Sequence, residues 1–275
     1  MSAITRPALR HSLTEVPRAT GETLQLMLQL PALIRQAPRG HGQPVLTLPG
    51  YGASDGSMKL MRLFLQAIGY RPFSLQLGRN IESRAERIRS VDDATAFRKR
   101  MAGNVARRIV ELQQQTGEKI TLVGWSMGGC YALDASQQQP DKVAAVITLG
   151  SPFGDPRGTA TWDILRWLSR STVAEADMDF AGWLDRSRLD ADFPVPVHVI
   201  YSERDGIVSR EVARLPDHPA VQHRQVDSSH MAFAFNPRAY AALAQLLQQA
   251  GSADQNGTSS SANEPSNGDG GGISS

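Results

Sequence analysis

A serine flanked by glycines stands where a predicted strand meets a predicted helix. The sequence around Ser126 reads G-W-S-M-G (124–128), after an apolar run and before a helix-compatible stretch. This order is typical of a nucleophile elbow, a sharp turn that carries a serine between a strand and a helix. We expect strained backbone torsions at Ser126 and no room for a Cβ atom at Gly124 or Gly128. The pattern predicts a catalytic serine, with an ordinary Gly-rich turn as the alternative.

A serine nucleophile needs a base to take its proton and an acid to orient that base. In a strand–turn–helix architecture the acid and then the histidine follow the serine along the chain. Four histidines follow Ser126. His230 lies in a loop between the last predicted strand and the last predicted helix, where this order requires the base. His198 lies within a predicted strand, and His218 and His223 are interpreted as surface residues, so His230 is the predicted base.

Asp205 is the predicted acid. It follows the predicted strand 195–201 on a loop, and a carboxylate there lies at the same edge of a parallel sheet as the serine turn. Gly206 directly after it suits a turn. Two alternatives stay open. Asp155 follows the preceding predicted strand, and Glu203 follows the same strand as Asp205 but lies nearer to its end.

Two backbone N–H groups are expected to bind the oxyanion of a tetrahedral intermediate. The first belongs to Met127, the residue after the nucleophile. The second is expected from the loop after the predicted strand 45–49, where Tyr51 stands between Gly50 and Gly52. These glycines would let the backbone turn inward, and the alternative is a simple Pro-Gly turn.

The elements that would position these residues alternate between strands and helices. Apolar residues at helical spacing predict helices, and short apolar or alternating runs predict strands. Predicted strands lie at 45–49, 73–77, 120–123, 143–149, 195–201 and 222–226, and predicted helices at 22–34, 57–69, 92–115, 130–139 and 237–249. This alternation indicates an α/β fold with a mostly parallel central sheet, helices on both faces and a small inserted cap.

Three regions are expected along the chain. Residues 1–40 form an N-terminal helical extension and residues 41–250 the α/β domain. Residues 251–275 are almost entirely Gly, Ser, Asn, Asp and Gln, which predicts a disordered tail. Residues 151–191, rich in Trp and Leu, are interpreted as a cap-like insertion. The leucine-rich run 22–34 is interpreted as a helix packed on the domain, with a membrane-surface or lid role as the alternative.

Charge and composition narrow the partners. The formal net charge of +2 does not indicate a nucleic acid. Basic residues concentrate between Arg79 and Arg108 among acidic ones, which favours a solvated helix face over a phosphate or membrane patch. Cys130 is the single cysteine, so no intramolecular disulfide is expected, and we expect it to be buried. Residues 1–18 lack the apolar core of a secretory signal, so a cytoplasmic location is expected.

Several further segments resemble one known family. They are P-G-Y (49–51), D-G-S-M (55–58), L-G-R-N (77–80), T-L-G-S-P-F-G-D-P-R (148–157), Y-S-E-R-D-G-I-V (201–208) and S-S-H followed by N-P (228–237). With the G-x-S-x-G turn, they resemble a bacterial lipase and carboxylesterase-like group of the α/β-hydrolase superfamily. The resemblance implies an α/β-hydrolase fold over roughly residues 41–250. It also implies Ser126, Asp205 and His230 as a catalytic triad.

The function predicted from these residues is hydrolysis of carboxylic esters by a serine esterase or lipase through an acyl-enzyme. A thioesterase or acyltransferase acting on acyl-coenzyme A or another acyl carrier is the main alternative, and a non-catalytic binding protein on the same scaffold is a third. The expected partner is a small-molecule or lipid ester. No cofactor, metal site or transmembrane segment is predicted. Peripheral membrane contact and the oligomeric state stay open.

Overall fold

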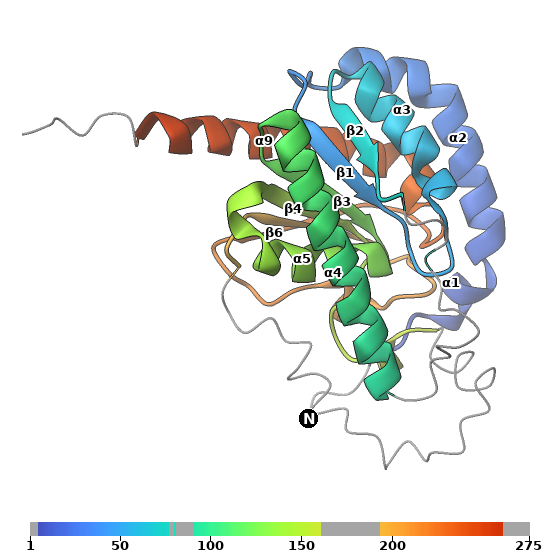
Figure 1. Cartoon of the computed structure of the whole chain (residues 1–275). Helices are drawn as coiled ribbons and strands as arrows, with labels where there is room; N and C mark the ends of the chain where they lie inside the picture. Colours follow the sequence, from blue (N-terminus) through green and yellow to red (C-terminus); the bar gives the residue numbers. More distant parts are fainter. Residues whose placement is uncertain (1–4, 77–79, 81–90, 161–192, 261–275) are drawn as a thin grey trace, which may run out of the picture.

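A single parallel sheet forms the centre of the part of the chain that the structure describes. The computed structural model describes residues 5–76, 80, 91–160 and 193–260 (Figure 1). Within these ranges the sheet has six strands in the order β2-β1-β3-β4-β5-β6, and every neighbouring pair is parallel. The strands are β1 (Pro44–Leu48), β2 (Arg71–Ser74), β3 (Ile120–Trp125), β4 (Val143–Leu149), β5 (Val197–Tyr201) and β6 (Val221–Gln225). The predicted α/β class is confirmed.

Helices cover both faces of the sheet. On one face α5 (Met127–Gln138) packs on β3 and β4, and α4 (Val91–Thr116) packs on α5 and crosses in front of the sheet in Figure 1. On the other face α9 (Pro237–Ser260) contacts β4 and β5, and α3 (Lys59–Ala67) contacts β2. An outer helix, α2 (Glu15–Gln36), packs against both α9 and α3. The shorter helices are α1 (Leu9–Leu13), α8 (Arg210–Ala213), η1 (Asp55–Met58), η2 (Pro140–Lys142), η3 (Pro156–Gly158) and η5 (Phe233–Phe235).

The strands are buried because helices pack on both of their sides. Successive side chains of a strand point to opposite faces. On β1, Leu46 and Leu48 join the cluster under α4 and α5, whereas Val45 joins the cluster under α3 and α9. On β3, Leu122 joins the cluster under α4 and α5, and Val123 joins the cluster under α3 and α9. Near-continuous apolar runs such as β4 therefore belong to a sheet covered on both faces.

Several element boundaries differ from those predicted, among them those of β2, α2 and α9. Strand β2 covers 71–74 rather than 73–77. Helix α2 is longer than the predicted 22–34 and continues past Pro31. The last helix begins as predicted, since the Asn236 side chain accepts the N–H groups of residues 238 and 239, but α9 continues to Ser260. A helix that has already formed can extend without a new nucleation step. The polar composition after residue 249 was therefore a poor guide to where α9 ends.

For two predicted regions, most of the residues lie outside those that the structure describes. Residues 161–192 hold most of the predicted cap at 151–191, and residues 261–275 hold the end of the predicted tail. Among the helices that are described, none is both long and apolar enough to cross a membrane.

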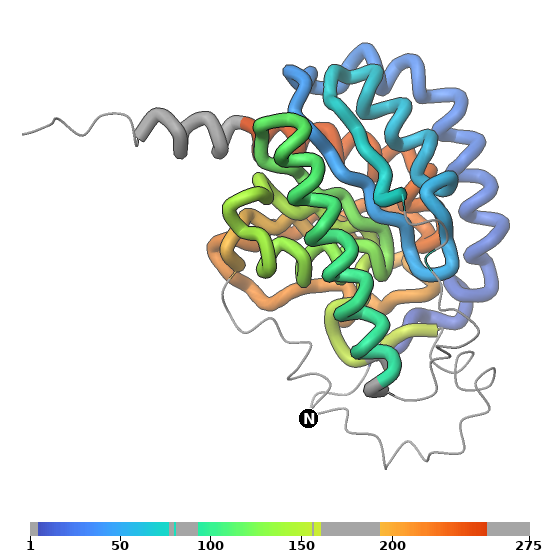
Figure 2. The backbone as a smooth tube through the Cα atoms, in the orientation of Figure 1, coloured from blue at the N-terminus to red at the C-terminus, as the bar shows by residue number. Residues whose placement is uncertain are grey.

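The N-terminal helices contact loops that lie far along the sequence. Figure 2 shows the first helices beside the segments that follow β5 and β6, although these parts are far apart in the sequence. The contact is direct, because Ser12 of α1 donates a hydrogen bond to the carbonyl of Gly206, 2.6 Å away. The N-terminal helices therefore reach the loops in which the predicted acid and base lie.

The interpretation of the basic run as a solvated helix face is wrong for Arg98. Its guanidinium is buried and binds Asp134 of α5 through Nε and Nη2, both at 2.7 Å. Burial is the largest influence and would lower the pKa of Arg98, but the hydrogen bond with Asp134 and the interactions with the neighbouring acidic groups together outweigh burial and raise that pKa. This paired fork is typical of arginine and a carboxylate, and it joins α4 to α5.

We expect Arg98→Ala to lower the free energy of unfolding by about 3 kcal/mol, because it leaves the Asp134 carboxylate without its partner. Urea unfolding followed by circular dichroism measures the change. The matched control is Arg71→Ala, which breaks a half-exposed pair with Glu118 and should cost less than about 1 kcal/mol. Equal losses in the two variants would contradict the importance assigned to the buried pair.

Candidate active site

Ser126 occupies a strained turn between β3 and α5. Its backbone torsions are φ 53° and ψ −126°, which L-residues rarely adopt. The turn is held by the Ser126 N–H, which donates to the Leu149 carbonyl at 2.8 Å. A Cβ atom at Gly128 would collide with the carbonyl oxygens of residues 48 and 49, and one at Gly124 with the backbone of Gly129. The expected strain and the need for both glycines are confirmed.

His230 faces the serine from the loop between β6 and α9. Its Nε2 lies 3.0 Å from Ser126 Oγ, and its ring is buried. The indole N–H of Trp125 donates to the His230 carbonyl at 3.1 Å, and the Phe233 ring meets the imidazole edge-on at 6.3 Å between centroids. The residue before the serine thus helps to hold the histidine loop against the turn.

Asp205 holds the other side of the imidazole. Its Oδ2 lies 2.8 Å from His230 Nδ1, and its Oδ1 accepts the N–H groups of Ile207 and Val208, both at 2.8 Å. A carboxylate only accepts hydrogen bonds, so Nδ1 must carry the proton, and a neutral ring then offers Nε2 as an acceptor for the Ser126 hydroxyl. The structure thus brings Ser126, His230 and Asp205 into one hydrogen-bonded series.

The electrostatics of the buried imidazole favour its protonated form. Burial by itself would lower the pKa of His230, but the charge and hydrogen bond of Asp205 and the charge of Glu15 outweigh burial and raise it above its ordinary value. A group at this position is able to accept a proton and remain charged while bonds rearrange at the serine.

The alternatives that the sequence left open bind other partners. Asp155 holds the Arg157 guanidinium, and Glu203 is half-exposed and lies 2.7 Å from Arg210 Nη1. His198 Nδ1 lies 3.0 Å from the side-chain oxygen of Gln222 on the neighbouring strand. Of the three carboxylates considered, Asp205 is the one bonded to His230.

Met127 and the loop that carries Tyr51 both lie next to the serine. Met127 is the first residue of α5, where an N–H has no acceptor within the helix. The loop that carries Tyr51 passes the nucleophile closely, since a Cβ atom at Gly50 would lie 3.2 Å from Ser126 Cβ. Both segments thus lie beside the hydroxyl, at the positively polarised end of α5.

Asn80 is a residue of this loop region that reasoning from the residues did not single out. It is buried, and its side-chain Nδ2 donates to the Pro49 carbonyl at 3.1 Å. Its backbone N–H donates to Ala53, and its carbonyl accepts the N–H of Gly52. Asn80 therefore forms hydrogen bonds to residues before and after Tyr51, which hold this loop in place. The only signal was its place in the L-G-R-N segment.

Cys130 of α5 lies outside the series from Ser126 to Asp205. Cys130 is buried, and burial raises its pKa to about 12, so the thiol stays protonated. Within the described ranges, no group of three or more His, Cys, Asp or Glu side chains is arranged to hold a metal ion.

Comparisons with known proteins agree on the fold. Residues 43–172 match the family model described as the alpha/beta hydrolase fold. The mature lipase BlEst2 of Bacillus licheniformis superposes with a TM-score of 0.51 at 17% identity, over 78% of this chain and 94% of that one. A thermophilic esterase from Thermogutta terrifontis superposes with a TM-score of 0.51 at 18% identity, over 77% and 92%.

A sequence relative is much longer than this chain. The atrochrysone carboxylic acid synthase PKS4 of Calonarius odorifer is 30% identical over 138 residues. That stretch is 50% of this chain but only 8% of the synthase.

Proposed function

The chain has the α/β-hydrolase fold and belongs to the α/β-hydrolase superfamily, and from this premise we propose that it is a serine hydrolase that cleaves carboxylic esters. The observation that carries the proposal is the continuous series from Ser126 Oγ through the His230 imidazole to Asp205. The lipase and esterase among the structural neighbours are consistent with this substrate class.

In the acylation step Ser126 Oγ attacks the ester carbonyl while His230 Nε2 takes the hydroxyl proton. The N–H groups of Met127 and Tyr51 bind the oxyanion that forms. His230 then gives its proton to the departing alkoxide, and an acyl-enzyme on Ser126 remains. Asp205 stays ionised throughout, keeps Nδ1 protonated and stabilises the imidazolium.

In the deacylation step water replaces the alcohol. His230 takes a proton from the water as it attacks the acyl carbonyl, and returns that proton to Ser126 Oγ when the tetrahedral intermediate collapses. The carboxylic acid then leaves and the enzyme is restored.

The test combines a covalent probe with a substrate series. A fluorophosphonate should label the protein once, on the peptide that contains Ser126, because an activated serine attacks phosphorus as it attacks an ester carbonyl. Hydrolysis of p-nitrophenyl esters from acetate to laurate then gives the acyl preference. Labelling at another residue, or none, would overturn the proposed nucleophile.

Labelling of Ser126 without ester hydrolysis would instead favour a thioesterase or acyltransferase. Matched acyl-coenzyme A substrates separate these classes. Two arginines of the basic run that could otherwise meet coenzyme A phosphates already have carboxylate partners, since Arg98 binds Asp134 and Arg108 binds Glu111. We therefore expect the oxygen ester to be the better substrate.

A further inference from the structure

The first turn of α2 places a buried carboxylate between the two loops that carry Asp205 and His230. Glu15 Oε1 accepts the backbone N–H of Met231 at 2.9 Å, and Glu15 Oε2 accepts the backbone N–H of Gly206 at 3.1 Å. One side chain thus joins the residue after His230 to the residue after Asp205. Its position in the sequence is 216 residues from Met231 and 191 from Gly206.

Glu22 repeats this contact about two turns further along the same face of α2. Its two oxygens accept the backbone N–H of Ser229 at 3.0 and 3.1 Å. Glu22 Oε2 also accepts the Ser228 hydroxyl at 3.2 Å and the side-chain amide of Asn236 at 2.7 Å. Since Ser229 precedes His230, the peptide neighbours of the histidine on both sides donate to carboxylates of one helix.

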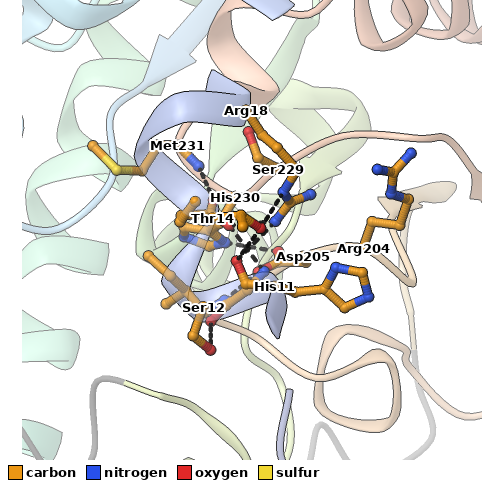
Figure 3. Close-up of polar contacts among 12 residues, drawn as sticks. His11, Ser12, Thr14, Arg18, Arg204, Asp205, Ser229, His230 and Met231 are labelled. Atoms are coloured by element: carbon orange, nitrogen blue, oxygen red, sulfur yellow. Dashed lines mark hydrogen bonds and ion pairs between the residues drawn. The ribbon is translucent and has the colours of Figure 1, made fainter. Parts of the chain in front are cut away.

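The approach of the N-terminal helices is so close that it requires a glycine. A Cβ atom at Gly206 would lie 2.5 Å from Glu15 Oε2 and would collide with the carbonyl oxygen of His11. Gly206 does not have the left-handed torsions that favour glycine in turns. Its missing side chain therefore makes room for the start of α2, and Figure 3 shows Ser12 and Arg18 of these helices beside Asp205 and His230.

A buried carboxylate next to Asp205 is an unfavourable way to join two elements. Burial raises the pKa of Glu15, the nearby Asp205 charge acts in the same direction, and the Met231 N–H and the Arg18 charge oppose them. Arg18 Nη2 lies 3.0 Å from Glu15 Oε2. Apolar packing would join a helix to two loops without desolvating a charge. The use of a buried carboxylate instead indicates that Glu15 orients the loops of Asp205 and His230.

We propose that α2 completes the active site, with Glu15 and Glu22 as positioning residues that hold the loops of Asp205 and His230 in register with Ser126. The inference rests on the proposed serine hydrolase function and adds to it two residues that never touch the substrate. Small displacements of catalytic groups have large effects on rate, so such residues matter although they lie behind the reacting atoms.

The first test is kinetic. Glutamine has one acceptor oxygen, so Glu15→Gln leaves one of its two backbone donors facing an amide NH₂. We expect Glu15→Gln and Glu22→Gln each to lower kcat for the best p-nitrophenyl ester by about 10- to 100-fold with little change in KM. The matched control is Glu118→Gln, which breaks a half-exposed ion pair with Arg71 and should leave kcat unchanged.

The second test follows the protonation of His230 in Glu15→Gln, first by NMR and then through the pH dependence of the rate. The charged groups around His230 are Asp205 after β5 and Glu15 of α2, with Arg18 paired to Glu15. Because the Glu15 charge helps to raise the pKa of His230, an NMR titration of this ring should give a lower pKa in Glu15→Gln. The acidic limb of the kcat/KM profile should move to lower pH, whereas Glu118→Gln should leave both unchanged.

The third test reads the loops directly. In Glu15→Gln, amide hydrogen exchange should accelerate at Gly206 or Met231, whichever loses its acceptor, and in Glu22→Ala it should accelerate at Ser229, while core strands keep their protection. Unchanged exchange and an unchanged His230 titration in folded variants would overturn the inference, even if wild-type Ser126 reacts with the fluorophosphonate. A wild-type protein that does not react would overturn the proposed function instead, and the exchange and titration would still decide the role of α2.

Discussion

Replacing Ser126 with alanine should reduce ester hydrolysis on the order of 10⁶-fold, the scale of loss when a comparable nucleophile is removed. The variant retains His230, Asp205 and the oxyanion donors, but without Oγ no acyl-enzyme forms. Only direct attack by water remains, helped by the oxyanion donors. Initial rates with the preferred p-nitrophenyl ester at high enzyme concentration measure the residual activity.

The matched control for this experiment is Ser136→Ala. Ser136 is buried on α5, and its hydroxyl donates to the Leu133 carbonyl at 2.8 Å, away from the proposed nucleophile. This variant should keep wild-type kcat and fluorophosphonate labelling. Activity in Ser126→Ala within tenfold of wild type would refute the covalent mechanism.

Asp205→Asn should lower kcat by about 10⁴-fold. The carboxylate accepts the Nδ1 proton at 2.8 Å, and its other oxygen is occupied by two backbone N–H groups. Those two donors keep the amide oxygen of asparagine on their side, so its NH₂ group would face Nδ1. The imidazole would then carry its proton on Nε2, the wrong nitrogen for accepting the Ser126 hydroxyl proton.

Two substitutions test the acids that the sequence left open. Asp155→Asn removes charge from the pair with Arg157, and Glu203→Gln removes it from the pair with Arg210. Both should keep kcat within a few-fold of wild type, because neither side chain contacts His230. A 10⁴-fold loss in either of them, with an active Asp205→Asn variant, would move the acid to that position.

The fold and the three central side chains could be predicted because their signals are local. The apolar run of β4 and the periodicity of α4 are typical of a covered strand and of a helix that packs on one side. Ser126 lies in a turn with a steric requirement for glycine, and Asp205 and His230 follow it in a fixed order on loops after later strands. The end of α9 and the partner of Arg98 were missed, since composition does not describe either.

Local patterns along the chain were enough to predict the α/β architecture, the elbow at Ser126 and a short set of candidate acids and bases. The contacts of the folded chain were needed to show that Asp205 rather than Asp155 or Glu203 meets the imidazole, and that Glu15 and Glu22 bind the loops behind it. Periodicity and turn chemistry act between near neighbours, whereas a hydrogen bond between Glu15 and Met231 joins residues 216 positions apart and leaves no pattern along the chain.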